Sequence, residues 1–123
     1  MTSLRFEKLS SQHNLDGFAC GEEPLDRFLT QFALVNQRAN ASQTYLVLAD
    51  DSVAGYYTLT VGEVSYADAP EKLTKGLARH PVPLMILARL AVDLGWQSHG
   101  IGAALLKDAA VRTLAAAEIA GVR

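Results

Sequence analysis

The feature that most constrains this fold is the stretch of residues 84–106, LMILARLAVDLGWQSHGIGAALL, in which an apolar strand leads through a glycine-bearing turn into a helix. A helix leaves its first backbone N–H groups without intrahelical partners, and Gly100 and Gly102 carry no Cβ to keep an anion away from them. The helix dipole adds partial positive charge at the same point. We therefore predict a phosphate-binding turn at the carboxyl end of the strand.

The glycine spacing distinguishes between kinds of phosphate site. Gln97, Gly100 and Gly102 fit the Q/R-x-x-G-x-G/A pattern of the GNAT acyl-CoA-dependent N-acetyltransferases, and the preceding strand has that family's LxRLAVD-like sequence. The turn lacks the third glycine of the dinucleotide fingerprint and the lysine of the Walker motif. The sequence thus resembles the GNAT family here, which implies that the phosphate is the pyrophosphate of coenzyme A.

Composition sets limits on the class of protein. Half of the 123 residues are hydrophobic and a fifth are charged, which predicts one soluble domain over residues 1–123. A net charge of −2 gives no global positive field, so any RNA contact must come from a local patch. The single cysteine excludes an internal disulfide, and we predict no metal site. With no signal segment and no apolar run of about 18 residues, we expect a cytoplasmic protein without membrane contact.

The amino-terminal third predicts a strand and a helix. Residues 4–9 alternate apolar and charged side chains, as an edge strand does. Within residues 18–37, with Pro24 suited to the first turn, apolar residues recur at helical spacing and predict one amphipathic stripe of Leu25, Phe28, Leu29, Phe32 and Val35.

The same segment carries a second resemblance. The pattern F-x-C-G, then L-x-x-F-L, then A-x-x-N-Q is similar to the amino-terminal signature of the GNAT toxins of bacterial toxin–antitoxin pairs. The matching residues are Phe18, Cys20, Gly21, Leu25, Phe28, Leu29, Ala33, Asn36 and Gln37. Cys20 is interpreted as a small buried thiol beside a glycine turn rather than a nucleophile.

The middle of the chain predicts a hairpin and a connector. Residues 43–49 and 53–64 are rich in β-formers around an Asp-Asp-Ser turn and predict two antiparallel strands, with Gly62 at a bulge or a strand end. Residues 65–83 form a charged connector. Its basic residues, which we interpret as a solvated loop rather than an RNA-docking point, are Lys72, Lys75, Arg79 and His80.

The last two elements follow from their apolar content. Residues 84–92 are apolar except for Arg89, which predicts a central strand buried on both faces, with the arginine paired with a carboxylate. A helix is predicted from about residue 101 to about residue 120, before Gly121. Its expected apolar stripe is Leu106, Ala109, Ala110, Leu114 and Ala117, and its expected polar side is Lys107, Asp108, Arg112 and Glu118.

The element order reads as α+β, with a GNAT-like mixed, largely antiparallel sheet flanked by helices. The resemblance implies that acetyl-CoA is the co-substrate and that its pantetheine arm pairs with the strand at Leu90, Ala91 and Val92. It further implies that the backbone amides of the turn hold the pyrophosphate, at Gln97, Ser98, His99, Gly100, Ile101, Gly102 and Ala103.

In the toxin branch the resemblance implies acetylation of the amino group of aminoacyl-tRNA, which blocks translation, and neutralisation by a small DNA-binding antitoxin. The family's remaining strand–helix–strand portion, with the tyrosine assigned as general acid, has no counterpart here. Without that portion, the strand of residues 84–92 would have an unpaired edge. We therefore expect a domain that ends after the helix following the turn, as a fragment, a truncated gene product, or half of an assembly completed by another copy, such as a homodimer.

Other readings stay open at this point. The titratable residues expected near the cleft, none of which receives a role, are Tyr56, Tyr57, Glu63, Asp93 and His99. Of the two adjacent tyrosines on one strand, one is expected to point inward and the other outward. A housekeeping acetyltransferase for a small amine or protein amino group is one alternative. A catalytically incomplete fragment that binds coenzyme A or the antitoxin is another.

Overall fold

The computed structural model describes residues 3–64 and 82–120, with side chains described for residues 3–61 and 85–113. Four antiparallel strands form one sheet in the order β1-β2-β3-β4. Their bounds are Leu4–Lys8, Gln43–Ala49, Ser52–Val64 and Val82–Val92. The expected connector residues Lys72, Lys75, Arg79 and His80 lie outside the described residues. The predicted α+β class and antiparallel pairing are confirmed.

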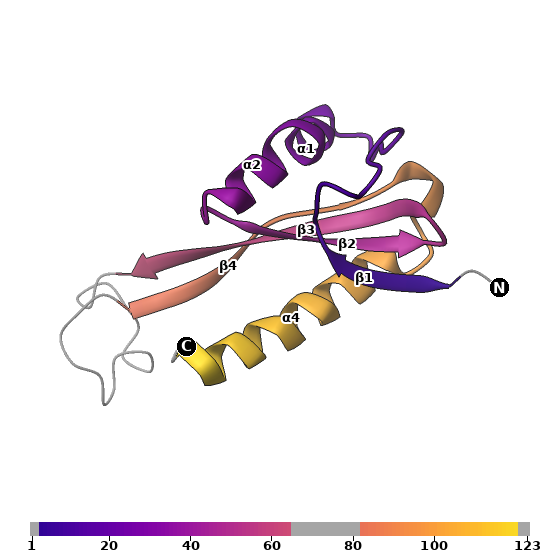
Figure 1. The fold of residues 1–123 in the computed structure, drawn as a ribbon. Coiled ribbons are helices and arrows are strands. Elements are labelled where there is room, and N and C mark those ends of the chain that lie inside the picture. The colour runs from indigo at the N-terminus through magenta and orange to yellow at the C-terminus, as the bar shows by residue number, and fades with distance from the viewer. Residues whose placement is uncertain (1–2, 65–81, 121–123) are drawn as a thin grey trace.

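Helices cover both faces of the sheet, as Figure 1 shows. One face carries α1 (Glu23–Arg27), the π-helical turn Phe28–Phe32 and α2 (Ala33–Arg38), and the other carries α4 (Ile101–Ala120). A short 3-10 helix, Leu94–Trp96, lies between β4 and α4. In the described part of the chain, no helix is both long and apolar enough to cross a membrane.

The strands supply both cores by alternation. We call α1, the π-helical turn and α2 the first helical layer. Under it, Leu46, Leu48 and Tyr56 pack with Phe28 and Leu29. The opposite side chains of the same strands pack with α4, namely Val47, Ala49, Ala54, Tyr57 and Leu59 against Ile101, Leu105 and Ala109. Tyr56 and Tyr57 are both fully buried, so the expectation that one of them points outward is wrong. Each face of β3 is covered by helix, so both side chains are buried.

The first helix is interrupted by the π-helical turn, where the N–H of Ala33 donates to the carbonyl of Phe28. The extra residue in this turn rotates everything that follows it. Ala33 is therefore buried, whereas Phe32 is 49% exposed and Val35 is 62% exposed. The predicted stripe is correct at Phe28 and Leu29 and wrong at its last two members.

Strand β4 departs from its predicted burial. Ile86 and Leu87 are exposed, because within the described sheet β4 pairs only with β3 and its other edge is open. Thr58 pairs with Arg89 and Leu59 with Leu87, so Ala88 is an extra residue that forms a β-bulge. Gly62 continues the regular pairing near the strand end rather than forming a bulge.

Helix α4 has the predicted bounds but a rotated face. Ile101, Leu105 and Ala109 are buried, whereas Leu106 and Ala110 are exposed. The rotation has a polar cause. Tyr57 donates its hydroxyl proton to the Asp108 carboxylate, and the Arg112 guanidinium lies 4.2 Å from the centre of the Tyr45 ring. Asp108 and Arg112 were expected on the solvent side of the helix.

Gly55 permits the closest contact between sheet and helix. A Cβ on Gly55 would lie 2.8 Å from the carbonyl oxygen of Ala91, 3.0 Å from Leu105 Cδ1 and 3.3 Å from Ile101 Cγ2. We predict that Gly55→Ala lowers the free energy of unfolding by about 1–3 kcal/mol through overpacking, as measured by urea denaturation.

Gly102→Ala is the matched control for that substitution. A Cβ on Gly102 meets only Val92 Cγ2, at 3.8 Å, and alanine favours helix over glycine. Its stability is expected to be unchanged or up to about 1 kcal/mol higher. Equal effects of the two substitutions would contradict the close contact at Gly55.

The buried tyrosines predict a loss of stability in alkali. Burial raises the pKa of both Tyr56 and Tyr57 well above the ordinary value of 10.0. The unfolded chain releases these protons near that pH while the folded chain retains them, so stability is complete below it and falls as the pH rises further. Tyr57→Phe should flatten the fall in unfolding free energy above about pH 10 in urea titrations. Parallel pH profiles for variant and wild type would show that Tyr57 does not contribute.

Candidate functional site

The predicted anion-binding turn forms as a loop of exposed backbone between β4 and α4. Ser98 and Gly100 have positive φ angles of 67° and 78°. No atom lies within 4 Å of the position of a Cβ on Gly100, so its backbone is open to solvent. The first helical bond runs from the N–H of Ala104 to the carbonyl of Gly100, at 3.1 Å.

The turn therefore brings together the donors that the sequence predicted. The N–H groups of Ile101, Gly102 and Ala103 precede the first helical bond and are available at the helix end. Ile101 is buried and packs against the sheet, so its contribution to an anion site is its backbone N–H alone. Gly102 has no side chain that could obstruct its own N–H group, which lies between those of Ile101 and Ala103.

Two predicted side chains of the turn make contacts within the protein. The Gln97 side chain turns inward, where Nε2 donates to the carbonyls of Cys20 at 2.9 Å and Val92 at 3.1 Å. His99 is exposed, its Nδ1 lies 2.9 Å from the carbonyl of Gln97, and its ring lies edge-on to Trp96. Since a carbonyl only accepts, Nδ1 carries the proton.

A groove extends from this turn along β4. It is a hollow of about 320 Å³, and its lining residues are Cys20, Glu22, Leu25, Leu90, Ala91, Val92 and Gln97. The predicted strand positions 90–92 thus line the same hollow as Gln97, the first residue of the predicted turn. The opposite wall, Cys20, Glu22 and Leu25, was not predicted as part of it. The F-x-C-G pattern identified this segment in the sequence, but no local signal indicated where it packs.

Cys20 has the structural role that the sequence predicted. Its side chain is buried, and the thiol donates to the carbonyl of Glu22 at 3.5 Å. Burial, followed by the hydrogen bond with Asp26, raises the pKa of this thiol. A thiol that keeps its proton is a poor nucleophile, so we interpret Cys20 as a residue that lines the groove and not as a nucleophile.

The other titratable candidates bond to groups of the protein itself, and none receives a role in proton transfer. The Tyr56 hydroxyl donates to the carbonyl of Leu25 at 2.7 Å, and the Tyr57 hydroxyl is held by Asp108 under α4. Asp93 accepts backbone N–H groups with both carboxylate oxygens. The side chain of Glu63 lies outside the described side chains. Arg89 lies over the Phe28 ring, 3.8 Å from its centre, and within the described side chains it has no carboxylate partner of the kind we expected.

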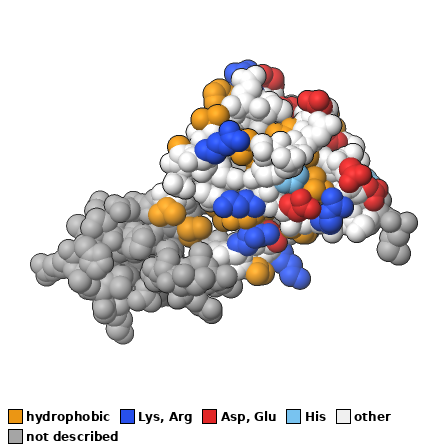
Figure 2. All heavy atoms as spheres, in the orientation of Figure 1, with side chains coloured by type: hydrophobic (Ala, Val, Ile, Leu, Met, Phe, Trp, Pro, Cys, Tyr) orange, Lys and Arg blue, Asp and Glu red, His pale blue; other side chains and the backbone are white. Residues whose placement is uncertain are grey.

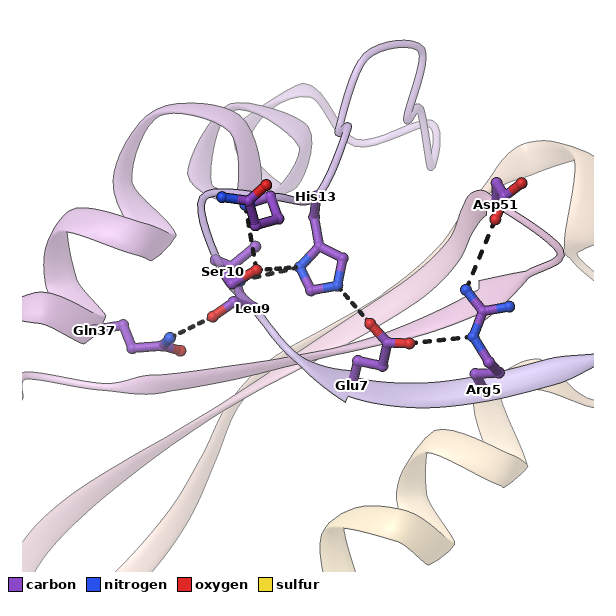
Figure 3. A network of polar contacts seen from close by, with 8 residues as sticks. Arg5, Glu7, Leu9, Ser10, His13, Gln37 and Asp51 are labelled. Carbon is purple, nitrogen blue, oxygen red and sulfur yellow. Dashed lines mark hydrogen bonds and ion pairs between the residues drawn. The ribbon is translucent and has the colours of Figure 1, made fainter.

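A second hollow, of about 360 Å³, lies beside β1 and is polar. Figure 3 shows the His13 ring between Ser10 and Glu7. The N–H of Ser10 donates to Nδ1 at 3.0 Å, so Nε2 carries the proton and donates to Glu7 at 2.8 Å. This bond, followed by that from Arg5, lowers the pKa of Glu7. These groups satisfy one another and fasten the loop after β1, so we assign the functional site to the groove beside β4.

Comparison with known proteins identifies relatives of this chain. No model of a known protein family matches the sequence. The chain is 37% identical over 116 residues to a tRNA-acetylating toxin of Mycobacterium tuberculosis, which covers 94% of this chain and 69% of that protein. It is 27% identical over 115 residues to the probable toxin TacT of Sinorhizobium fredii, covering 91% and 64%. The chain therefore spans about two thirds of the length of these relatives.

Solved structures share the fold. A structure of AtaT complexed with acetyl-methionyl-tRNAfMet matches with a TM-score of 0.85 and 29% identity over 98% of this chain and 74% of that one. AtaTR bound with acetyl-CoA matches at 0.83 and 30% identity, covering 97% and 73%. An AtaT variant bound to the C-terminus of the antitoxin AtaR matches at 0.80 and 30% identity, covering 98% and 70%.

The groove beside β4, the open turn before α4 and the identity to a curated toxin point to the same family as the two sequence patterns, and that expectation is confirmed. This chain belongs to the family of GNAT-type toxins that includes the tRNA-acetylating toxin and AtaT.

Proposed function

We propose that this chain forms the acetyl-CoA site of an N-acetyltransferase that acetylates the amino group of aminoacyl-tRNA and so blocks translation. The observation that carries the proposal is the continuity between the open N–H groups of the turn and the groove along β4, joined at Gln97. A pyrophosphate at the turn would direct the attached pantetheine arm into that groove. The names of the relatives supply the chemical class of both substrates.

The turn suits a pyrophosphate through its backbone. The N–H groups of residues 97–103 and the dipole of α4 favour negative charge at this helix end. Gly100 and Gly102 give the phosphate oxygens room to approach. Among the side chains, Ser98 and His99 are exposed beside the same donors. The assignment of residues 97–103 rests on this geometry.

Strand β4 suits the pantetheine arm through its open edge. The N–H of Asp93 donates to Ala54 on β3, and successive residues of a strand alternate their backbone direction. Ala91 therefore faces β3 as Asp93 does, while Leu90 and Val92 face the open edge. The carbonyl of Val92 indeed accepts from the Gln97 side chain on that side. The amide groups of pantetheine can pair with this edge as a further strand would.

The proposed reaction is direct acyl transfer. The neutral amine attacks the thioester carbonyl, the new N–C bond forms as the C–S bond breaks, the amine loses a proton, and the leaving thiolate gains one. Backbone N–H groups polarise the carbonyl oxygen as negative charge develops on it. The hydroxyls of Tyr56 and Tyr57 already donate to Leu25 and Asp108, so we assign no described side chain to the proton transfers.

The surface supports a polyanionic acceptor despite the net charge of −2. Figure 2 shows Lys and Arg side chains in a band over the first helical layer, the β1 edge and α4. The exposed or half-exposed basic residues of α2, β1 and α4 are Arg38, Arg5, Lys8, Lys107 and Arg112. Phosphate contacts of this kind position a nucleic acid without reading its sequence. We further propose that the protein acts in the cytoplasm and is neutralised by an antitoxin, as AtaT is bound by AtaR.

Gly102→Glu provides the sharpest test of the cofactor site. A glutamate early in the first turn of a helix favours the fold, but here its carboxylate would lie among the N–H groups meant for pyrophosphate. At about 5 Å, repulsion between two charges near a protein surface costs about 3 kcal/mol, so acetyl-CoA affinity should fall by about 100-fold in calorimetric titration.

Gly102→Ala is again the matched control, since it adds a Cβ without charge, and its acetyl-CoA affinity should fall much less than that of Gly102→Glu. Gly100 is a poorer test because its φ of 78° strains any other residue. Equal affinity of Gly102→Glu and wild type would contradict the turn as the pyrophosphate site.

The acceptor is tested by transfer of labelled acetyl groups. Label should enter aminoacyl-tRNA and should be absent from deacylated tRNA, because only the former offers an α-amino group. Transfer to small amines or proteins, with none to aminoacyl-tRNA, would favour the housekeeping reading instead. Binding of acetyl-CoA with no transfer to any amine would identify a non-catalytic binding module.

A further inference from the structure

Asp93 places a carboxylate where an anion site would be expected to exclude one. It follows Val92 at the end of β4 and precedes the turn that offers its N–H groups to a phosphate. A carboxylate free in this position would repel the pyrophosphate that the site is proposed to bind. Its presence therefore calls for a structural explanation.

The explanation lies in the two hydrogen bonds that the carboxylate accepts. Oδ1 accepts from the N–H of Ala19 at 3.1 Å, and Oδ2 accepts from the N–H of Gly95 at 2.9 Å. The first bond joins residues 74 positions apart in the chain. The backbone reinforces it, since the N–H of Leu94 donates to the carbonyl of Ala19 at 2.7 Å. The charge is thus directed at backbone donors of two segments.

Gln97 joins the same two segments with the opposite polarity. Its Nε2 donates to the carbonyl of Cys20 and to the carbonyl of Val92. Asp93 therefore accepts from the N–H of Ala19, and Gln97 donates to the carbonyl of Cys20, so the two side chains bond to complementary backbone groups. We call these four side-chain bonds the Asp93–Gln97 clamp.

The clamp fixes one wall of the groove. Cys20 and Glu22 line the groove opposite Leu90 and Val92, and they belong to the segment that the clamp holds. Gly21, with a φ of 97°, lets this segment turn closely against Leu94, whose Cδ2 would lie 3.4 Å from a Cβ. The backbone bond from Leu94 to Ala19 also joins these segments, but among the described hydrogen bonds no other side chain of the turn bonds to this wall.

We propose that Asp93 and Gln97 are positioning residues for the cofactor, which hold residues 19–21 against the turn so that groove wall and anion donors keep one fixed arrangement. This proposal rests on the proposed function, because it concerns the same acetyl-CoA site. Neither side chain needs to touch the cofactor. Their effect is to order the wall and the turn before binding, which removes that ordering cost from the affinity.

Asp93→Asn separates this positioning role from a purely electrostatic role, because the two predict opposite changes in acetyl-CoA affinity. If the carboxylate acted only through its charge, removing the charge would strengthen acetyl-CoA binding. If it positions the wall, binding should weaken, because the asparagine amide presents an NH₂ group to one of the two backbone donors. We expect acetyl-CoA affinity to fall about five- to tenfold in calorimetric titration of the same 123-residue chain.

Asp51→Asn is the matched control. Asp51 is fully exposed in the β2–β3 turn, so its substitution makes the same change in net charge without touching the clamp. It should leave acetyl-CoA affinity within about twofold. Unchanged or tighter binding by Asp93→Asn would overturn the positioning role.

Gln97→Met keeps the test decisive if Asp93→Asn unfolds. Methionine matches the length of glutamine and changes no charge, but it cannot donate to the carbonyls of Cys20 and Val92. We expect a similar loss of affinity with the fold retained, and no loss would overturn the proposal.

Amide hydrogen exchange gives a readout that general destabilisation would not produce. In Asp93→Asn, protection should fall at Ala19 and Gly95 while the amides of β2 keep their wild-type protection. An even loss across the sheet would instead indicate a purely structural role. Failure of the wild-type chain to bind acetyl-CoA would overturn the proposed function, whereas wild-type binding unaffected by both clamp variants would overturn the positioning role alone.

Discussion

The close contact at Gly55 is the constraint on which the rest of the structure depends. Because Gly55 has no side chain, the first turn of α4 packs directly on β3 through Ile101 and Leu105, beside the carbonyl of Ala91 on β4. This contact brings the helix end next to the carboxyl end of β4. The packing of the core and the placement of the proposed anion site therefore depend on the same missing side chain.

The middle of α4 is held by polar contacts as well as by apolar ones. The Tyr57 hydroxyl donates to Asp108, which also accepts from Arg112 at 2.8 Å, and Arg112 stacks on Tyr45. The rings of Tyr45 and Tyr57 lie 5.3 Å apart, so the four side chains form one group between sheet and helix. A polar group of this kind fixes the rotation of a helix more specifically than alanine side chains can, because each donor must meet its acceptor.

The sequence predicted the features that depend on local chemistry. The strand, the glycine turn and both ends of α4 follow from hydrophobic content and from residues such as Gly100 and Gly102, whose conformational demands act within a few positions. Features that depend on distant partners were missed. The π-helical turn that exposes Phe32 and the rotation of α4 that exposes Leu106 depend on what packs against each element, and periodicity carries no information about this.

The site itself shows the same division between local and distant determinants. The turn proposed to bind phosphate consists of consecutive backbone N–H groups that the glycine spacing predicted, whereas the opposite wall of the groove is held by bonds such as that from Ala19 to Asp93. Since the anion donors belong to the backbone, the side chains of Ser98, His99 and Ala103 can vary without removing a single donor. The clamp side chains cannot vary so freely, because Asp93 and Gln97 each satisfy two backbone groups at once. In the proposed site, therefore, the arrangement of groove and turn depends on side chains that bond to the protein backbone.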